Sequence, residues 1–75
     1  MDAAEEISAK LMLLLKDARL EQGMSHETLA VAARLDRSTI SLYESGQRTP
    51  TITSALRVAH ALGLSLSELL AQIEE

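Results

Sequence analysis

The side chains of this chain that could make directional contacts with a ligand follow one stripe of residues 37–45, RSTISLYES. Residues three or four positions apart share a face of an α-helix. If the segment is helical, its outward face carries Arg37, Ser38, Ser41, Leu42 and Ser45. A guanidinium group pairs with guanine through two hydrogen bonds, a hydroxyl donates or accepts, and an apolar side chain contacts a thymine methyl. This stripe therefore fits the major groove of duplex DNA, and bulky side chains would hold the helix away from the bases.

The opposite stripe of the same segment has the composition of a buried face. It carries Ile40, Tyr43 and Glu44 at spacings of three and four residues. We expect Tyr43 to be a core residue rather than a stacking surface, because it shares this face with Ile40. A buried carboxylate at Glu44 would need a partner. The segment is thus expected to be anchored by one stripe and to present the other.

Helix signals recur at short intervals and predict a single all-α domain over residues 1–75. The expected helices cover residues 4–21, 26–34, 37–45, 52–62 and 66–75. The residues placed to cap the last four helices at their N-termini are Ser25, Asp36, Thr51 and Ser65. The apolar repeat of the fourth helix is Ile52, Leu56, Ala59 and Leu62.

Composition and charge exclude several classes of protein. The 75 residues include no Cys, Trp or Phe, and 47% are hydrophobic, which fits one small aliphatic core and excludes disulfides and Cys-based zinc sites. The net charge is −4, but six of the eleven acidic residues lie in residues 2–6 and 68–75, so the rest of the chain carries +2. The acidic N-terminus is unlike a signal peptide, and no apolar run is long enough for a membrane span. We therefore expect a soluble cytoplasmic protein with a modestly basic central face.

The sequence shows no pattern of catalytic or metal-binding residues. His26 and His60 are isolated and there is no cysteine, so no metal site is expected. A chain of this size has little room for a pocket and shows no nucleophile-elbow motif, so we expect no enzyme, cofactor or small-molecule ligand. His60, in the otherwise apolar fourth helix, is expected to be a partly buried packing residue.

The run from Gly23 to Leu69 resembles the helix-turn-helix family of phage repressors and Xre-type regulators. That family follows approximately G-L-S-Q-E-x-L-A, a turn, I-S-x-x-E-x-G-x-R-x-P, and L-x-x-I-A-x-A-L-G-V-S. The matching positions are Gly23, Ser25, Glu27, Leu29, Ala30, Ile40, Ser41, Glu44, Gly46, Arg48, Pro50, Leu56, Ala59, Ala61, Leu62, Gly63 and Ser65. They extend over about two thirds of the chain, a much more specific signal than one short motif. LDRSTIS, residues 35–41, is further similar to the recognition helix of controller proteins in restriction-modification systems, which are short, acidic and dimeric.

The resemblance implies a five-helix, lambda-repressor-like DNA-binding fold. Its helix-turn-helix, about residues 25–46, would be formed by the second and third helices. The implied base contacts come from Arg37, Ser38, Thr39 and Leu42. The implied phosphate contacts come from Ser25, His26, Ser45, Gln47 and Arg48. A buried ion pair between Arg19 and Glu44 is also implied, and the function would be sequence-specific regulation of transcription.

Two residues depart from the family pattern. The usual Gln at the start of the second helix, which contacts a phosphate and braces the recognition helix, is His26 here. A neutral imidazole can still donate one hydrogen bond. The usual glycine of the turn is Arg34, which must either adopt a left-handed conformation at some cost or use a variant turn.

The last helix carries Leu66, Leu69, Leu70 and Ile73, which could close the chain's own core or join two copies. Helix-turn-helix proteins usually bind as two-fold dimers to half-sites about one helical turn, roughly 34 Å, apart. We therefore expect a homodimer on an inverted-repeat DNA site, with the last helix as the dimer surface, assisted by the exposed side of LMLLL, residues 11–15.

Simpler interpretations of the same residues stay open. Arg37, Ser38 and Ser41 could form an ordinary solvated face, and Arg48 could be a solvated loop charge. Leu42 could cover core or partner surface instead of a thymine methyl. The low basicity also leaves room for a protein-interaction module on the same fold, such as an antitoxin or an adaptor.

Overall fold

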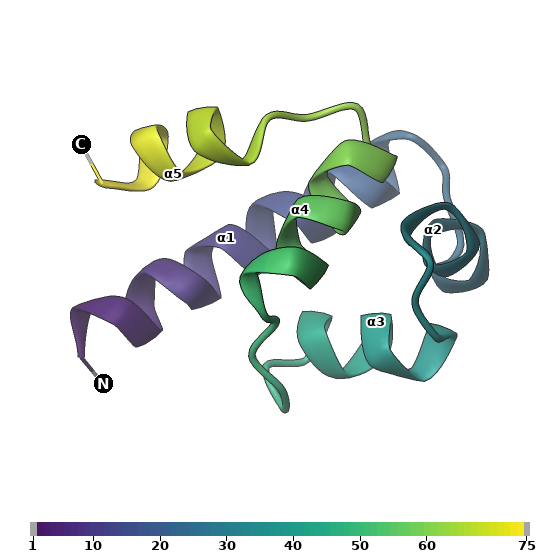
Figure 1. Ribbon diagram of the computed structural model, residues 1–75, viewed down its shortest axis with the longest axis horizontal. Coiled ribbons are helices and arrows are strands. Elements are labelled where there is room, and N and C mark those ends of the chain that lie inside the picture. Colours follow the sequence, from purple (N-terminus) through teal and green to yellow (C-terminus); the bar gives the residue numbers. More distant parts are fainter. Residues whose placement is uncertain (1, 75) are drawn as a thin grey trace.

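The computed structural model describes residues 2–74, and within that range it contains five α-helices and no strand. The helices are α1 (Ala3–Glu21), α2 (His26–Ala33), α3 (Arg37–Glu44), α4 (Ile52–Ala61) and α5 (Leu66–Glu74) (Figure 1). Each boundary lies within one residue of the predicted one, and residues 1 and 75, included in the expected domain, lie outside the described residues. The all-α prediction is therefore confirmed.

The helices are arranged so that α3 lies along one edge of the molecule and α5 along the opposite edge (Figure 1). Between them run α1 and α4, while α2 packs against both α3 and α4, and α5 packs on α1. The C-terminal end of α5 and the N-terminal end of α1 lie at the same end of the molecule, away from α2 (Figure 1). This arrangement leaves the outer side of α3 uncovered by any other helix.

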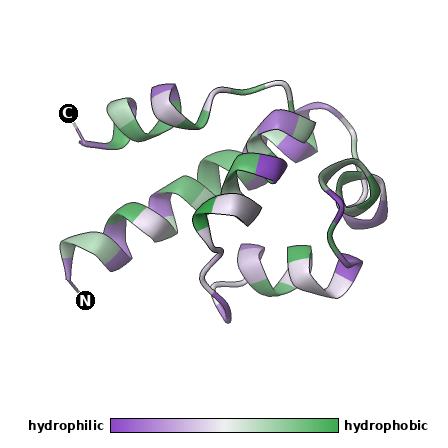
Figure 2. Cartoon of the chain, in the orientation of Figure 1, coloured by the Kyte–Doolittle hydropathy of each residue, from purple (hydrophilic) through white to green (hydrophobic). Residues whose placement is uncertain are grey.

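The core is mostly aliphatic and draws on every helix. Its largest fully buried side chains are Leu15, Leu29, Ile40 and Val58. Burying a side chain of this size contributes about 1.5–3 kcal/mol relative to leaving it in water. Figure 2 shows hydrophobic stretches along the middle of α1 and on α4, with hydrophilic positions interspersed between them on both helices. Ile40 thus ties α3 to the same core that holds α1, α2 and α4 together.

The buried face of α4 differs in part from the predicted one. Ile52 is 78% exposed and Leu56 is 37% exposed. The other two members of the predicted repeat, Ala59 and Leu62, are buried as expected, and Ala55 and Val58 are buried in place of Ile52 and Leu56. Two overlapping helical stripes are available in this segment, and the one with the small side chains faces inward. Small residues allow two helix axes to approach closely, so the contact between α4 and α2 favours the alanine stripe.

His60 also differs from expectation, because it is exposed rather than partly buried.

Three of the four predicted N-cap side chains make a capping hydrogen bond, and one does not. Ser25, Thr51 and Ser65 each accept a hydrogen bond from a backbone N–H three residues later. Asp36 has the extended backbone of an N-cap, but its side chain makes no capping hydrogen bond. α3 therefore starts without the side-chain bond that commonly adds about 1 kcal/mol.

Candidate nucleic-acid interface

The helix that carries the candidate base-contacting residues is held by its inner face. Ile40 and Tyr43 are buried, and Tyr43 is a core residue as expected. On the other face, Arg37, Ser38 and Ser41 are exposed, while Thr39 and Leu42 are half-buried. In the part of the chain that the structure describes, the side chains of Arg37, Ser38 and Thr39 make no hydrogen bond to the protein. Their polar groups are therefore available to an external ligand.

Leu42 is not part of the core. It is half-buried, and it does not belong to the aliphatic cluster around Leu15 and Ile40. By contrast, Leu35 in the preceding turn packs against that cluster. This placement fits an outward role for Leu42 better than a core role.

The turn between α2 and α3 is fixed by backbone hydrogen bonds and by one strained residue. Arg34 has φ 59° and ψ 43°, which is the left-handed conformation, so the first of the two expected solutions applies. Its N–H donates to the Val31 carbonyl, and the Leu35 N–H donates to the Ala30 carbonyl at 2.9 Å. A residue with a Cβ atom pays roughly 1–2 kcal/mol for this conformation. The Arg34 side chain is exposed and borders a shallow hollow with Arg57 and His60 of α4.

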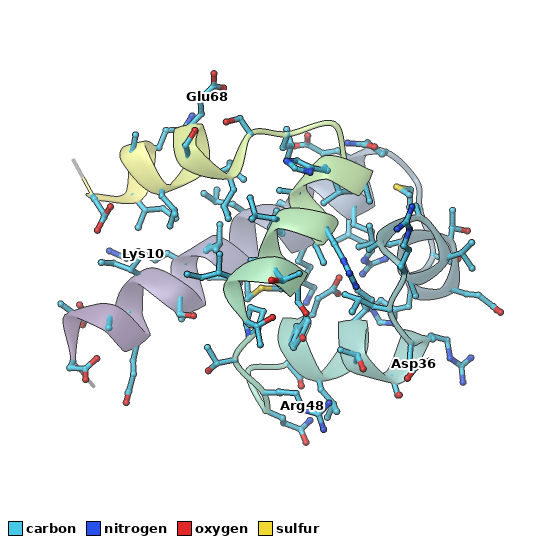
Figure 3. The ribbon with its side chains drawn as sticks, viewed as in Figure 1. Lys10, Asp36, Arg48 and Glu68 are labelled. Atoms are coloured by element: carbon cyan, nitrogen blue, oxygen red, sulfur yellow. The ribbon has the colours of Figure 1, made fainter. Side chains whose placement is uncertain are left out.

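The candidate phosphate contacts lie at the two ends of the helix-turn-helix. Ser25 is exposed and caps α2 through the Thr28 N–H at 3.0 Å. Ser45, Gln47 and Arg48 are exposed in and after the C-terminal end of α3. The Gln47 side-chain amide donates to Ser45 Oγ at 2.9 Å, which orients both groups. Figure 3 shows Arg48 in the loop that follows α3, Asp36 at the start of α3, and Glu68 on the opposite side of the molecule.

Arg19 and Glu44 join α1 to α3. Arg19 Nε donates to Glu44 Oε2 at 2.7 Å, and Nη2 donates to Oε1 at 2.9 Å. The third guanidinium nitrogen, Nη1, donates to the Met24 carbonyl at 2.8 Å. Only 9% of the Arg19 side chain and 7% of the Glu44 side chain are exposed. The pair therefore fixes the C-terminal end of α3 against the body of the molecule.

His26 completes this cluster from the start of α2. Its Nε2 atom lies 3.0 Å from Glu44 Oε1, so the histidine braces α3 at the position where the family has glutamine. Burial by itself would raise the pKa of Glu44, but hydrogen bonds from Arg19 and His26 outweigh it and hold that pKa below its usual value. The hydrogen bond to Glu44 raises the pKa of Arg19 further. Both partners consequently stay charged at neutral pH.

Several contacts around this site had no signal in the sequence. The Gln22 side chain donates to the Leu62 carbonyl at 2.8 Å and so ties the end of α1 to the end of α4. Arg19 also donates to the backbone carbonyl oxygen of Met24. A pattern of residue types does not predict a hydrogen bond to a backbone group. A groove of about 760 Å³ lies between α1 and the loop after α3, with Glu5, Glu44, Arg48 and Pro50 in its lining. Within this lining, the carboxylate of Glu44 is already bonded to Arg19 and His26.

The residues expected on the dimer surface differ in their exposure to solvent. Leu66 is 8% exposed and belongs to the chain's own core, contrary to its expected place on a dimer surface. Leu69, Leu70 and Ile73 are half-buried against that core.

Among residues 2–74, no three His, Asp or Glu side chains are grouped as a metal site would need, and no helix is long and apolar enough to cross a membrane.

Comparison with known proteins places the described geometry in a family. A family described as helix-turn-helix matches residues 15–69. The chain is 36% identical over 62 residues to the control protein C.MunI from Mycoplasma sp, covering 81% of this chain and 84% of that protein. It is 35% identical over 49 residues to the uncharacterised HTH-type transcriptional regulator YqaF of Bacillus subtilis strain 168, covering 65% of this chain and 64% of YqaF.

A solved structure gives the same result at the level of the fold. The crystal structure of a tyrosine-to-alanine mutant of the restriction-modification controller protein C.Esp1396I superposes with a TM-score of 0.81 at 32% identity. The superposition covers 91% of this chain and 88% of that one.

Proposed function

Because this chain belongs to the Xre-type helix-turn-helix family of DNA-binding transcriptional regulators, we propose that it binds duplex DNA sequence-specifically by inserting α3 into the major groove. The observation that supports this most directly is the free outer face of α3. Arg37 and Ser38 are exposed, carry unsatisfied polar groups among the described residues, and lie on a helix that Ile40, Tyr43 and Glu44 anchor from behind. A rigid helix of this kind can dock without a large ordering cost.

Within this proposal each outward residue has a distinct task. Arg37 pairs with a guanine through two hydrogen bonds, while Ser38, Thr39 and Leu42 read neighbouring base edges or a thymine methyl. Ser25, His26, Ser45, Gln47 and Arg48 contact phosphates on either side of the groove. Phosphate contacts set the position of a protein on DNA, and base contacts set its preference. The chain acts by binding in this scheme, and it performs no catalysis and requires no cofactor.

We further propose that two copies bind an inverted repeat. An interface on the edge opposite α3 would point the two recognition helices apart, so the copies must meet at a lateral end of the molecule. The end where α5 finishes and α1 begins satisfies this condition (Figure 1). Leu70 and Ile73, in the second half of α5, keep part of their apolar surface exposed. The molecule is 30 Å in its longest dimension, which is comparable to the roughly 34 Å between successive major grooves.

Selection of binding sites from random duplexes, followed by titration of the selected duplex at several salt concentrations, tests this function. We expect an inverted repeat with half-sites one helical turn apart, and an affinity that falls steeply as salt rises. A protein-interaction module would enrich no sequence and would show no salt-dependent binding to DNA. That result would overturn the proposal.

A further inference from the structure

The side chain of His26 contacts a buried carboxylate and is also partly exposed to solvent. As the first residue of α2 it turns Nε2 toward Glu44 Oε1 at 3.0 Å, yet 36% of its side chain is exposed. Its other ring nitrogen, Nδ1, makes no hydrogen bond to any residue from 2 to 74. The ring therefore lies between a buried carboxylate and the surface where the proposed function places a DNA phosphate.

The hydrogen-bonding capacity of imidazole limits what this ring can do in its neutral form. Neutral histidine has one N–H donor and one acceptor nitrogen, whereas the protonated ring has two donors. An ionised carboxylate is an acceptor only, and Arg19 keeps Glu44 ionised. The hydrogen of neutral His26 must therefore reside on Nε2, and Nδ1 is left as an acceptor. A phosphate oxygen is also an acceptor, so neutral His26 cannot bond to both groups at once.

We propose that DNA binding by this chain takes up a proton on His26, so that the imidazolium bridges a backbone phosphate through Nδ1 and Glu44 through Nε2. This inference rests on the proposed DNA-binding function and adds a regulatory property to it. The glutamine usual at this family position has two amide hydrogens and needs no proton to satisfy two acceptors. The histidine therefore makes the same brace and the same contact conditional on pH.

The charges around His26 favour proton uptake by its ring only when DNA is bound. Glu44 on α3 favours the imidazolium, but Arg19 on α1 already neutralises much of that carboxylate. The positive end of α2 itself opposes a cation on its first residue. The ionisable groups of α4, Arg57 and His60, border the opposite end of α2 beside Ala32 and Arg34, away from this ring. In the sequence, the one acidic residue adjacent to His26 is Glu27. A bound phosphate adds the further negative charge that the protein alone does not supply.

The sign of the effect follows from linkage. If the complex holds the proton on His26 more tightly than the free chain does, affinity rises as pH falls. Uptake of one proton changes the dissociation constant by at most about tenfold per pH unit for each subunit. The lowered pKa of Glu44 keeps the second anchor of the bridge ionised near neutral pH.

The experiment measures binding of the full chain to its selected duplex between pH 6 and pH 8 at constant ionic strength, for the unmodified chain, for His26→Gln and for His60→Gln. His60 is the matched control, because it is exposed and lies away from the cluster. Titration calorimetry in two buffers of different ionisation enthalpy counts the protons taken up. We expect the unmodified chain and His60→Gln to bind several-fold more tightly at pH 6 than at pH 7.5, with net proton uptake, and His26→Gln to bind with little pH dependence and no uptake.

The outcomes separate the inference from the function on which it rests. Tight, sequence-specific binding with the same pH dependence in the unmodified chain and in His26→Gln would overturn the proton bridge while leaving DNA binding intact. Binding without any proton uptake in the unmodified chain would do the same. If none of the three proteins binds any selected duplex at any pH, the proposed function itself is wrong and the inference falls with it.

Discussion

Arg19 on α1 binds both carboxylate oxygens of Glu44 on α3, at 2.7 and 2.9 Å, across 25 positions of sequence. The two side chains are almost fully buried, and His26, which also contacts Glu44, is partly exposed. This contact connects the longest helix of the molecule to the C-terminal end of the helix that faces DNA in the proposed complex. The geometry of α3 therefore depends on a polar contact as well as on the aliphatic core.

Arg19→Ala should destabilise the fold strongly. The change removes three hydrogen bonds and leaves Glu44 buried with only His26 as a partner, and the loss of one member of a buried pair costs on the order of 3 kcal/mol. Urea unfolding followed by circular dichroism measures the difference. Arg48→Ala is the control, because that arginine is exposed and should change stability by less than about 0.5 kcal/mol. Equal stability of the two variants would contradict the structural role assigned to the pair.

Acid should remove part of the stability through Glu44. Its pKa is lowered in the folded chain, so the ionised carboxylate contributes stability above its usual value of 4.5, and that contribution is lost as pH falls through the lower folded value. We expect the difference in melting temperature between the unmodified chain and Glu44→Gln to be constant from pH 7 to about pH 5 and to shrink at lower pH. A difference that widens as pH falls would show that burial, rather than Arg19 and His26, dominates the environment of Glu44.

Arg34→Gly should stabilise the turn between α2 and α3. Glycine adopts φ near 60° without the Cβ clash that Arg34 carries, although it also makes the unfolded chain more flexible. The net gain should be about 0.5–1 kcal/mol in unfolding free energy. Arg34→Ala keeps the clash and should show no such gain, so a similar stabilisation in both variants would mean that the left-handed backbone is not the cause.

Arg37→Ala and Arg48→Ala should weaken DNA binding in different ways. Loss of Arg37 should cost about 1–3 kcal/mol on the selected duplex and relax the preference at one base position. Loss of Arg48 should weaken binding to all duplexes nearly equally and reduce the slope of log affinity against log salt by about one. Titrations of both variants on the selected duplex and on its single-base variants make the distinction. If Arg37→Ala bound as tightly and as selectively as the unmodified chain, α3 would not enter the groove as proposed.

Ile73→Lys should convert the proposed dimer into monomers. A charge at the half-exposed end of α5 would be buried without a partner if two copies met there. Sedimentation equilibrium measures the assembly state, and circular dichroism checks that the helices are intact. Ile52→Lys serves as the comparison, because Ile52 is the more exposed of the two isoleucines but lies at the start of α4. Dissociation caused by Ile52→Lys alone would move the interface to α4.

The helix boundaries were predictable because the signals that set them are local. Ser25, Thr51 and Gly63 act within one or two turns of the backbone, so the chain near each residue contains all the required information. The partnership of Arg19 with Glu44 could be expected only through the family resemblance, since the two residues are far apart in sequence. No spacing rule predicts such a contact.

The inward face of α4 and the place of Leu66 depended on tertiary packing. Both apolar stripes of α4 satisfy helical periodicity, and only the close approach of α2 selects the one containing Ala55 and Val58. Leu66 looks like its neighbours on α5, but its position at the start of the helix places it over the core. Asp36 shows a similar limit, because its backbone takes the capping conformation while its carboxylate makes no capping bond.

Tyr43 is the only tyrosine of the chain, which contains no tryptophan, and it lies buried on the inner side of α3. Intrinsic fluorescence and near-ultraviolet dichroism of the unlabelled protein must therefore originate at the back of that one helix. Any loosening of α3 from the body, by heat, by acid or on binding, exposes this ring to solvent and changes the optical signal. The chain thus carries a built-in reporter of recognition-helix docking, separate from the global helix content that far-ultraviolet measurements follow.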